Sequence, residues 1–280
     1  MKVHAKDGLP LNVLASEMRH EDTVILVNAP GMSSAVAERL MHALGENGMN
    51  FATWDLRGSP GEGEEFRAYR TSHHVDDLDA VLQALGPRRY VLASWCSGTP
   101  TALAALVERK VTPMAFVAFC VPNFAEKARY NLAGDTMERV CAIVVKDESK
   151  LEFLYEAMVA RSGLDKVTSD LDDAQLRQLV LAPFKSGAQA MLRYAWALMN
   201  RPEPREIRSW CAAVDVPMTF VGGKKDAMVS HLDSIELSKC SATAKHVIFD
   251  DWNHYGLFYD MPTVIREFKS LLGREKGGVQ

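Results

Sequence analysis

The chain has 280 residues, of which 48% are hydrophobic and 24% are charged, and its formal net charge at pH 7 is −4. These proportions are those of an ordinary globular protein and exclude a disordered or fibrous chain. The weak negative charge disfavours nucleic acid as the main partner, because phosphate binding requires a basic face. A small neutral or mildly polar ligand is expected instead.

The sequence also predicts the cellular compartment of the protein. Residues 1–10 carry polar and charged side chains at short intervals and no apolar run, so no secretory signal is expected. No segment reaches the apolar length of a membrane span, and no membrane association is predicted. The five cysteines are scattered without a Cys-x-x-Cys pair, which argues against a disulfide framework and against a zinc site. A reducing, cytoplasmic location is therefore expected, and neither a metal nor a cofactor is assigned.

Taken in chain order, the elements alternate between strands and helices. Residues 1–18 alternate around the turn dipeptide Asp7-Gly8 and predict an antiparallel hairpin. Short apolar runs rich in branched residues predict buried strands at 24–27, 91–93, 114–121 and 217–221, and residues 246–249 are predicted to form the last strand. Helical spacing is found at Val36, Leu40 and Leu44; Val75, Leu78, Leu82 and Leu85; Leu103, Leu106 and Val107; and Val264, Ile265, Phe268, Leu271 and Leu272, before Gly273. This alternation predicts the α/β class.

The middle of the chain departs from this rhythm. From about residue 123 to 208 the apolar spacing is almost entirely helical, and strand signals resume only at Val216. The sequence therefore predicts a core of residues 1–122 and 209–280 with a helical cap, residues 123–208, inserted over the sheet. The aromatic and methionine side chains of this cap predict an apolar, adaptable pocket that suits acyl chains or rings, although aromatic side chains more often belong to a core.

The most informative segment is Tyr90 to Thr99, which predicts a strand, a sharp turn and a helix. Cys96 stands between Ser94 and Gly98 in the pattern small-x-nucleophile-x-small, where small residues are needed because the strained turn presses neighbouring backbones together. Cys96 is therefore the predicted nucleophile. Ser97 is a weaker alternative, because it lies one position past the tip of the turn.

Several separated segments, in this order, resemble the α/β-hydrolase superfamily over nearly the whole chain. Residues 28–33 (Asn-Ala-Pro-Gly-Met-Ser) resemble its oxyanion loop, and residues 54–61 its D-x-R-G-x-G segment. Asp226, which ends the segment 217–226, and His254 match the acid and the late histidine of the family. The resemblance implies an α/β-hydrolase fold, with a mostly parallel sheet flanked by helices and an inserted helical cap.

The chemistry that such a triad would perform can be stated from its residue types. A thiol reacts as the thiolate, and a helix N-terminus and a histidine both lower the pKa of a thiol from about 8.5. His254 is expected to take the proton of Cys96 and return it to the leaving group. Asp226 is expected to accept the other ring N–H and hold the imidazole in the useful tautomer.

Two backbone N–H groups are predicted to form the oxyanion hole. One is that of Ser97, directly after the nucleophile. The second is assigned to Met32 in the loop 28–33, because Pro30 has no N–H to donate. Gly31 beneath Met32 would permit the close approach of backbone that this loop needs.

Other polar residues compete with these assignments. Asp250 and Asp251 lie too near His254 in sequence to reach back to it easily, so Asp226 is favoured. Asp55 and Arg57 are expected to be a structural pair that braces their loop. His73 and His74, beside Asp76 and Asp77, are expected to be solvated or capping residues at the start of a helix. Cys120, Cys141, Cys211 and Cys240 lie in apolar patterns and are assigned structural roles.

A cysteine nucleophile restricts the substrate. When a thiolate adds to an ordinary ester, the intermediate expels the thiolate again because it is the better leaving group. A thioester or another activated acyl donor avoids this reversal. The sequence therefore predicts an acyl-Cys96 enzyme, a thioesterase or acyltransferase, whose small-molecule acyl substrate is carried on a carrier protein or on coenzyme A in a biosynthetic pathway.

Two alternatives remain open at the level of the sequence. One is a lactonase resembling the dienelactone hydrolases, which also use a cysteine, although Thr99 stands where their elbow has a second glycine. The other is a ligand-binding or scaffolding protein that has kept the fold without the chemistry, because fold alone does not prove activity. The reactivity of Cys96 toward iodoacetamide as a function of pH separates this last alternative from an enzyme.

Overall fold

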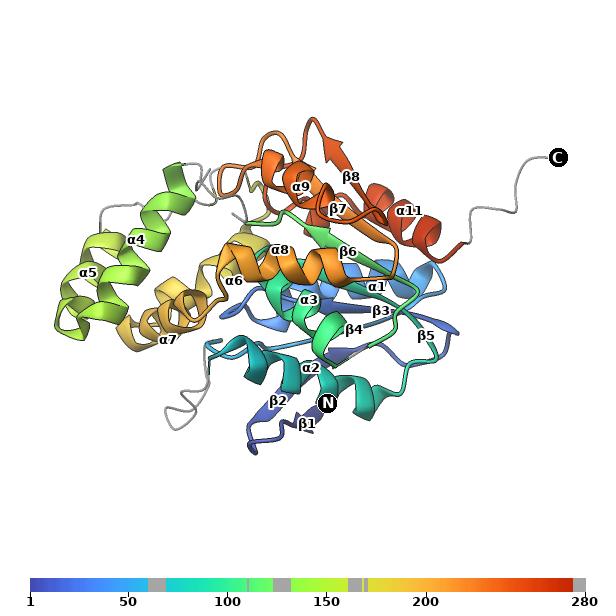
Figure 1. Cartoon of the computed structure of the whole chain (residues 1–280). Coiled ribbons are helices and arrows are strands. Elements are labelled where there is room, and N and C mark those ends of the chain that lie inside the picture. The colour runs from blue at the N-terminus through green and yellow to red at the C-terminus, as the bar shows by residue number, and fades with distance from the viewer. Residues whose placement is uncertain (60–68, 110, 123–131, 161–167, 169–170, 274–280) are drawn as a thin grey trace.

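The computed structural model describes residues 1–59, 69–109, 111–122, 132–160, 168 and 171–273 (Figure 1). Its centre is an eight-stranded sheet in the order β1-β2-β4-β3-β5-β6-β7-β8. β1 and β2 are antiparallel, β2 pairs antiparallel with β4, and all later pairs are parallel. The strands are β1 Lys2–His4, β2 Pro10–Ala15, β3 Asp22–Val27, β4 Asn50–Trp54, β5 Arg89–Trp95, β6 Ala115–Phe119, β7 Met218–Gly223 and β8 Ala244–Phe249.

The α/β class and the strands predicted from apolar runs are confirmed. The opening hairpin turns at Gly8, whose φ of 88° lies in the left-handed region that favours glycine. β4 has no apolar run of its own and was not among the strands predicted from such runs. All five of its residues are buried.

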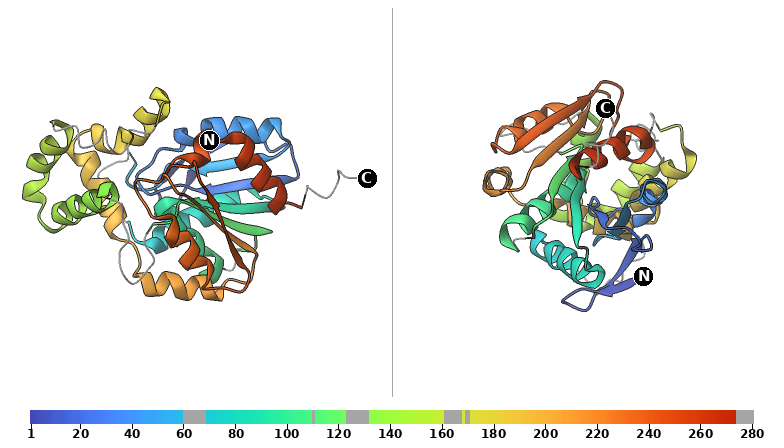
Figure 2. Two further views of the ribbon diagram at one scale, coloured as in Figure 1. Left: turned by 90° about the horizontal axis from the view of Figure 1, so that it is seen from above. Right: turned by 90° about the vertical axis from the view of Figure 1, so that its right-hand side faces the viewer.

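Helices cover both faces of the sheet. The helices of the described chain are α1 Glu38–Glu46, α2 Thr71–Leu85, α3 Thr99–Glu108, α4 Leu132–Lys146, α5 Leu151–Ala160, α6 Ala174–Lys185, α7 Ala188–Met199, α8 Pro204–Ala213, α9 His231–Ser238, α10 Gly256–Tyr259 and α11 Met261–Leu271, with short 3₁₀ turns η1 Ser34–Ala37, η2 Cys96–Gly98 and η3 Glu148–Lys150. α1 and α11 lie on one face, and α2, α3 and α8 lie on the other (Figure 2). Along β3, Val24 and Leu26 belong to the first core, whereas Ile25 and Val27 belong to the second, as the two-residue period of a strand requires.

The helices α4, α5, α6 and α7 gather beside the sheet rather than on its faces (Figure 1). α8, by contrast, packs on α3, and its Ile207 and Cys211 belong to the core under the sheet. The predicted cap boundary at residue 208 therefore lies within α8, and the start of the predicted cap, 123–131, lies outside the described residues. The division into core and cap remains a prediction.

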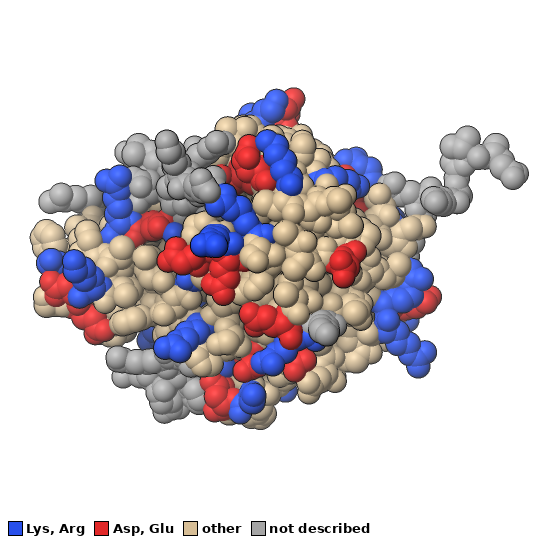
Figure 3. All heavy atoms as spheres, viewed as in Figure 1, with Lys and Arg blue, Asp and Glu red and all other residues tan. Residues whose placement is uncertain are grey.

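The surface gives two further observations. Basic and acidic side chains are interspersed over the face of the molecule shown in Figure 3. In the part of the chain that the structure describes, no helix combines the length and the apolar character needed to cross a bilayer.

Arg57 has other partners than the sequence predicted. Its guanidinium is 1% exposed, donates to Asp77 through Nε and Nη2 at 2.8 and 2.7 Å, and donates to Asp7 at 2.6 and 3.0 Å. Asp55 instead accepts hydrogen bonds from the Ser34 N–H at 2.6 Å and the Ser34 hydroxyl at 2.7 Å. The expected Asp55–Arg57 pair is therefore wrong, although both residues brace loops.

His74 is buried, and the prediction of a solvated or capping residue is wrong for it. Its side chain lies in α2 next to the Arg57 network and is 2% exposed. Among the described residues, neither ring nitrogen has a hydrogen-bond partner. Burial, helped by the nearby charge of Arg57, lowers the pKa of His74 to about 3.

The low pKa of His74 predicts acid sensitivity. Because the unfolded state binds a proton near pH 6.5 and the folded state does so only near pH 3, stability falls as the pH drops below about 6.5. Between pH 7.5 and 5.0, His74 is expected to remove about 2 kcal/mol of unfolding free energy. Urea titrations of His74→Leu should therefore show a smaller acid loss than those of the wild type, by that amount. His4→Leu, at an exposed site, is the matched control and should behave like the wild type.

Candidate active site

The predicted nucleophile lies at a sharp turn between β5 and α3. Cys96 follows the last residue of β5, is partly exposed and has a φ of 51°, a left-handed conformation that is uncommon for residues other than glycine. Gly98 is required by packing, because a Cβ atom there would lie 2.4 Å from the backbone oxygen of Asn28. The structure thus has the strained turn that the sequence predicts, with Cys96 at its tip.

Thr99, which replaces the second glycine expected of dienelactone hydrolases, has a structural role in this turn. Its hydroxyl lies 3.0 Å from the carbonyl oxygen of Cys96, to which it donates, and 3.0 Å from the hydroxyl of Ser94. Both Ser94 and Thr99 are fully buried. The side chain of Thr99 therefore ties the strand before the turn to the helix after it.

Asp226 and His254 are brought together by the loops that follow β7 and β8. The Nδ1 atom of His254 lies 2.8 Å from Oδ2 of Asp226. The other carboxylate oxygen, Oδ1, accepts the backbone N–H groups of Met228 and Val229, each at 2.8 Å. Both side chains are buried, so the carboxylate is fixed between the two backbone amides and the imidazole.

The loop that carries His254 is held against β5. The indole Nε1 of Trp95 donates to the carbonyl oxygen of His254 at 3.0 Å, and the two rings have centroids 5.2 Å apart. Gly223 allows the backbone of Trp252 to lie close to the end of β7, because a Cβ at Gly223 would lie 2.1 Å from the backbone oxygen of Trp252. The residue before the nucleophile thus positions the predicted base.

The electrostatics of His254 link it to Cys96. Burial by itself lowers the pKa of His254, but the Asp226 carboxylate, the nearby Cys96 and a hydrogen bond with Cys120 together outweigh burial and raise that pKa well above its usual value. The arrangement can therefore hold a proton on His254, with both cysteines close enough to influence it.

The two other candidate acids pair with lysine side chains rather than with His254. Asp250 and Asp251 are exposed and pair with Lys224 and Lys225, at 2.7 and 2.6 Å. Neither pair involves His254, whose Nδ1 partner is Asp226.

The predicted oxyanion loop is closed by its own hydrogen bonds. The side chain of Asn28 accepts from the Ala29 N–H at 2.9 Å and donates to the Ser33 carbonyl at 3.2 Å. The Met32 N–H donates to the Ala29 carbonyl at 3.1 Å. Ser97, in contrast, lies in the first turn after the strand, where N–H groups have no acceptor within the helix. Ser97 and Met32 remain predictions as donors to an oxyanion, and the Met32 N–H would have to leave its turn to serve.

The helix α7 contacts this loop directly. Gly31, with a φ of 79°, lies against the ring of Tyr194 in α7, and a Cβ at Gly31 would lie 2.4 Å from that ring. Tyr194 packs edge-on against Phe184 in α6, with ring centroids 4.7 Å apart. Both aromatics are largely buried, as expected for core rather than pocket residues.

Cys120 is the residue near the site that sequence reasoning missed. It follows β6, is 1% exposed, and its Sγ lies within 4.8 Å of ligand-type atoms of both Asp226 and His254. The available signal was its position directly after a buried strand, at the same sheet edge as Cys96. Such a trio of side chains could hold a metal ion, but both oxygens of Asp226 already accept N–H groups.

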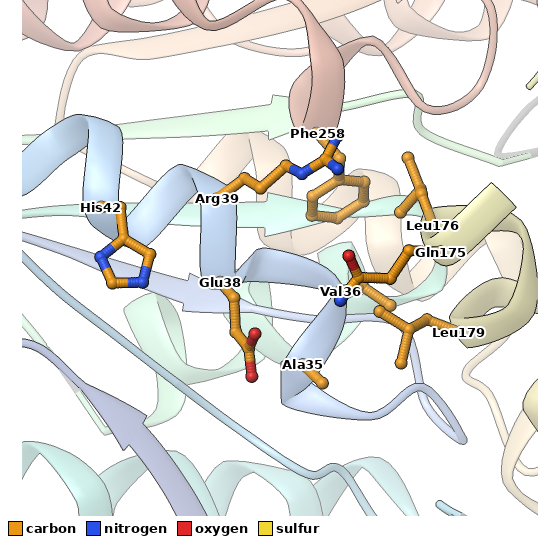
Figure 4. A pocket seen from close by; sticks show the side chains of 9 residues that line it. All are labelled: Ala35, Val36, Glu38, Arg39, His42, Gln175, Leu176, Leu179 and Phe258. Atoms are coloured by element: carbon orange, nitrogen blue, oxygen red, sulfur yellow. The ribbon is translucent and has the colours of Figure 1, made fainter. Parts of the chain in front are cut away.

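A groove opens at the junction of η1, α1, α6 and α10 (Figure 4). Its cavity volume is about 110 Å³, and it is lined by Ala35, Val36, Glu38, Arg39, His42, Gln175, Leu176, Leu179 and Phe258. Phe258 also packs edge-on against Trp95, with ring centroids 4.9 Å apart. Phe258 therefore lines the groove and also contacts Trp95, the residue that precedes Cys96.

Solved structures of two esterases and of an enol-lactonase superpose on nearly the whole chain. A thermophilic esterase from Thermogutta terrifontis superposes with a TM-score of 0.74 at 15% identity, covering 98% of both chains. An esterase from Exiguobacterium antarcticum superposes with a TM-score of 0.74 at 17% identity over 99% of both chains. The enol-lactonase from Burkholderia xenovorans LB400 superposes with a TM-score of 0.73 at 14% identity, covering 98% of this chain and 100% of that one. No curated protein matches the sequence.

At these identities the superpositions establish the fold alone. The family model described as the alpha/beta hydrolase fold matches residues 22–260, which include β3 to β8 and every predicted site residue. The sheet order and the sharp turn after β5 agree with that match. The chain therefore belongs to the α/β-hydrolase family.

Proposed function

We propose that this protein is a cysteine-dependent acyl-transfer enzyme, a thioesterase or acyltransferase, that forms an acyl-Cys96 intermediate from a thioester or an activated ester. The observation that carries the proposal is the partly exposed Cys96 at the tip of a left-handed turn, directly after Trp95, whose indole donates to the carbonyl of His254 in the buried His254–Asp226 pair. The catalytic residues would be Cys96, His254 and Asp226.

Each residue would have a definite task. The Cys96 thiolate attacks the carbonyl carbon, and protonated His254 then donates its proton to the leaving thiol as the tetrahedral intermediate collapses. Neutral His254 next takes a proton from the acceptor, which attacks the acyl-Cys96 carbonyl and releases the thiol of Cys96. Asp226 holds Nδ1, so that Nε2 is the atom that exchanges protons throughout. The N–H groups of Ser97 and Met32 are the proposed oxyanion donors.

The substrate class follows from the leaving group. The thiolate of Cys96 and the thiolate of a thioester substrate have similar leaving ability, so the intermediate can collapse toward the acyl enzyme. An alkoxide leaves far less readily, so an ordinary ester would return to starting materials. We propose a small acyl group delivered by a carrier protein or by coenzyme A, without nucleic acid or membrane as a partner.

The thiols also bear on the proposed location. All five cysteines are free in the structure. A nucleophilic thiol without a protecting disulfide suits a reducing compartment, and we propose the cytoplasm.

An enol lactone is the second candidate substrate. Its enolate leaving group is stabilised, so it too escapes the reversal that limits ordinary esters. The structural similarity to an enol-lactonase favours testing it, although that similarity establishes the fold alone.

The substrate preference provides the test. The wild type should turn over an N-acetylcysteamine thioester with a kcat/KM about 100-fold higher than that of the ethyl ester of the same acid. In Cys96→Ser the ratio of kcat/KM for the thioester to kcat/KM for the ethyl ester should fall at least about tenfold. A serine alkoxide is no better a leaving group than the alkoxide of the ethyl ester, so the intermediate no longer expels the enzyme's nucleophile preferentially. An enol lactone assayed in parallel decides between the two candidates. Equal or faster turnover of the ethyl ester by the wild type would refute the thioester proposal.

A further inference from the structure

Two cysteines lie at the ends of neighbouring strands. β5 and β6 are parallel, and their last registered pair is Trp95 with Phe119. The next residues on the two strands are Cys96 and Cys120. Both have a φ of 51°, and within the described part of the chain they are the only residues other than glycine with a positive φ.

This register places the Cα atoms of the two cysteines within the range that disulfides join. Neighbouring strands lie about 4.8 Å apart, and disulfides join Cα atoms about 4.4–6.8 Å apart. Cys120 is fixed in place by its N–H, which donates to the Val221 carbonyl at 2.8 Å. Its thiol lies 3.9 Å from the Asn253 carbonyl oxygen, directly before His254. The His254 imidazole is a hydrogen-bond partner of the Cys120 thiol and also interacts with Cys96.

The two thiols differ in access and in ionisation. Cys96 is partly exposed, whereas Cys120 is buried behind it. Burial raises the pKa of the Cys120 thiol to about 12, and the charges of Asp226 and of the Cys96 thiolate act in the same direction. An oxidant from solution would thus meet Cys96 first, and Cys120 would react only after a base takes its proton.

We propose that Cys120 is the resolving thiol of Cys96, so that oxidation by a hydroperoxide converts the nucleophile into a reversible Cys96–Cys120 disulfide. The inference goes beyond the proposed acyl transfer and does not depend on it, because it needs only a reactive Cys96, a nearby thiol and a shared base. Its consequence is a catalytic thiol that is protected from irreversible oxidation.

The steps balance with hydrogen peroxide as the oxidant. The Cys96 thiolate attacks one oxygen, the O–O bond breaks, and the other oxygen leaves as water with the proton of His254, so Cys96 becomes a sulfenic acid. Neutral His254 then takes the proton of Cys120, whose sulfur attacks Sγ of Cys96. The S–S bond forms as the S–O bond breaks, and hydroxide leaves as water with the His254 proton. In sum, two thiols and one peroxide give a disulfide and two waters.

The test uses the full chain treated with a few equivalents of hydrogen peroxide, blocked with N-ethylmaleimide and digested with trypsin without reductant. Cys96 and Cys120 fall in separate tryptic peptides, 90–109 and 111–127. The wild type should yield these two peptides linked, about 2 Da lighter than their sum, and dithiothreitol should restore alkylation of Cys96. Cys120→Ser should instead accumulate sulfinic acid at Cys96, about 32 Da heavier, with at least tenfold less thiol recovered by reductant.

Cys141→Ser is the matched control, because Cys141 is an equally buried thiol, 1% exposed, in α4. It should form the 90–109 to 111–127 link as the wild type does. Cys211 and Cys240 form another pair of interacting thiols, in peptides 209–224 and 240–245. The proposal is overturned if only that second pair becomes linked, or if the wild type and Cys120→Ser accumulate Cys96 sulfinic acid at the same rate. A Cys96–Cys120 disulfide in a protein that shows no acyl turnover would refute the proposed function but not this proposal.

Discussion

Asp226→Asn is expected to lower kcat/KM for an acyl thioester by about 10³–10⁴-fold. The size of this effect follows from the fixed surroundings of the carboxylate. Oδ1 accepts two backbone N–H groups, so the asparagine must keep its oxygen there and turn its NH₂ group toward Nδ1 of His254. An NH₂ donor facing Nδ1 forces the proton onto Nε2. The imidazole then cannot accept a proton from Cys96.

Steady-state kinetics with an N-acetylcysteamine thioester measure this loss. Asp251→Asn is the matched control, because Asp251 is exposed, lies near His254 in sequence and pairs only with Lys225 among the described ion pairs. It should change kcat/KM less than about twofold. A loss smaller than tenfold in Asp226→Asn would show that Asp226 does not set the tautomer of the base.

Arg57→Met is expected to lower the free energy of unfolding by about 3–5 kcal/mol. Arg57 and Asp77 are both buried, and the guanidinium is the group that offsets the burial of the Asp77 carboxylate. Burial raises the pKa of Asp77 while the hydrogen bonds from Arg57 lower it. Without Arg57 the Asp77 carboxylate loses the guanidinium that donates to it, so it is buried without that cation or takes up a proton at a cost to stability.

Urea titrations of Arg57→Met and Arg109→Met compare the loss of two arginines whose carboxylate partners are neighbours in α2. Arg109 pairs with Asp76, the neighbour of Asp77 in α2, but that pair is partly exposed. Its loss should cost less than about 1 kcal/mol. The double variant Arg57→Met with Asp77→Leu should recover part of the stability, because it removes both buried charges together. Equal costs in the two single variants would contradict the buried network described here.

The parts of the structure that were predictable are those whose cause is local. Strands buried on both faces need continuous apolar runs, and β3, β5, β6 and β7 have them. The strained turn at Cys96 needs small neighbours, which Ser94 and Gly98 supply. Asp226 and His254, 28 positions apart, were paired only through a resemblance to a family whose residues follow that order.

The parts that were missed depend on which strands become neighbours. Cys120 reaches the site because β6 lies between β5 and β7, an order that no local pattern encodes. Arg57 finds Asp77 and Asp7, 20 and 50 positions away, rather than the adjacent Asp55. His74 is buried beside Arg57, which belongs to another segment of the chain, so its helix-start position indicated exposure wrongly.

The central claim is that Cys96 carries the acyl group, and intact-protein mass spectrometry tests it most directly. A short incubation of the wild type with an acyl thioester, followed by an acid quench, should give a mass increase of one acyl group, mapped by digestion to the peptide 90–109 that contains Cys96. The adduct should disappear on treatment with hydroxylamine and should be absent from Cys96→Ala. An adduct on another peptide, or none with any thioester while turnover proceeds, would contradict the account.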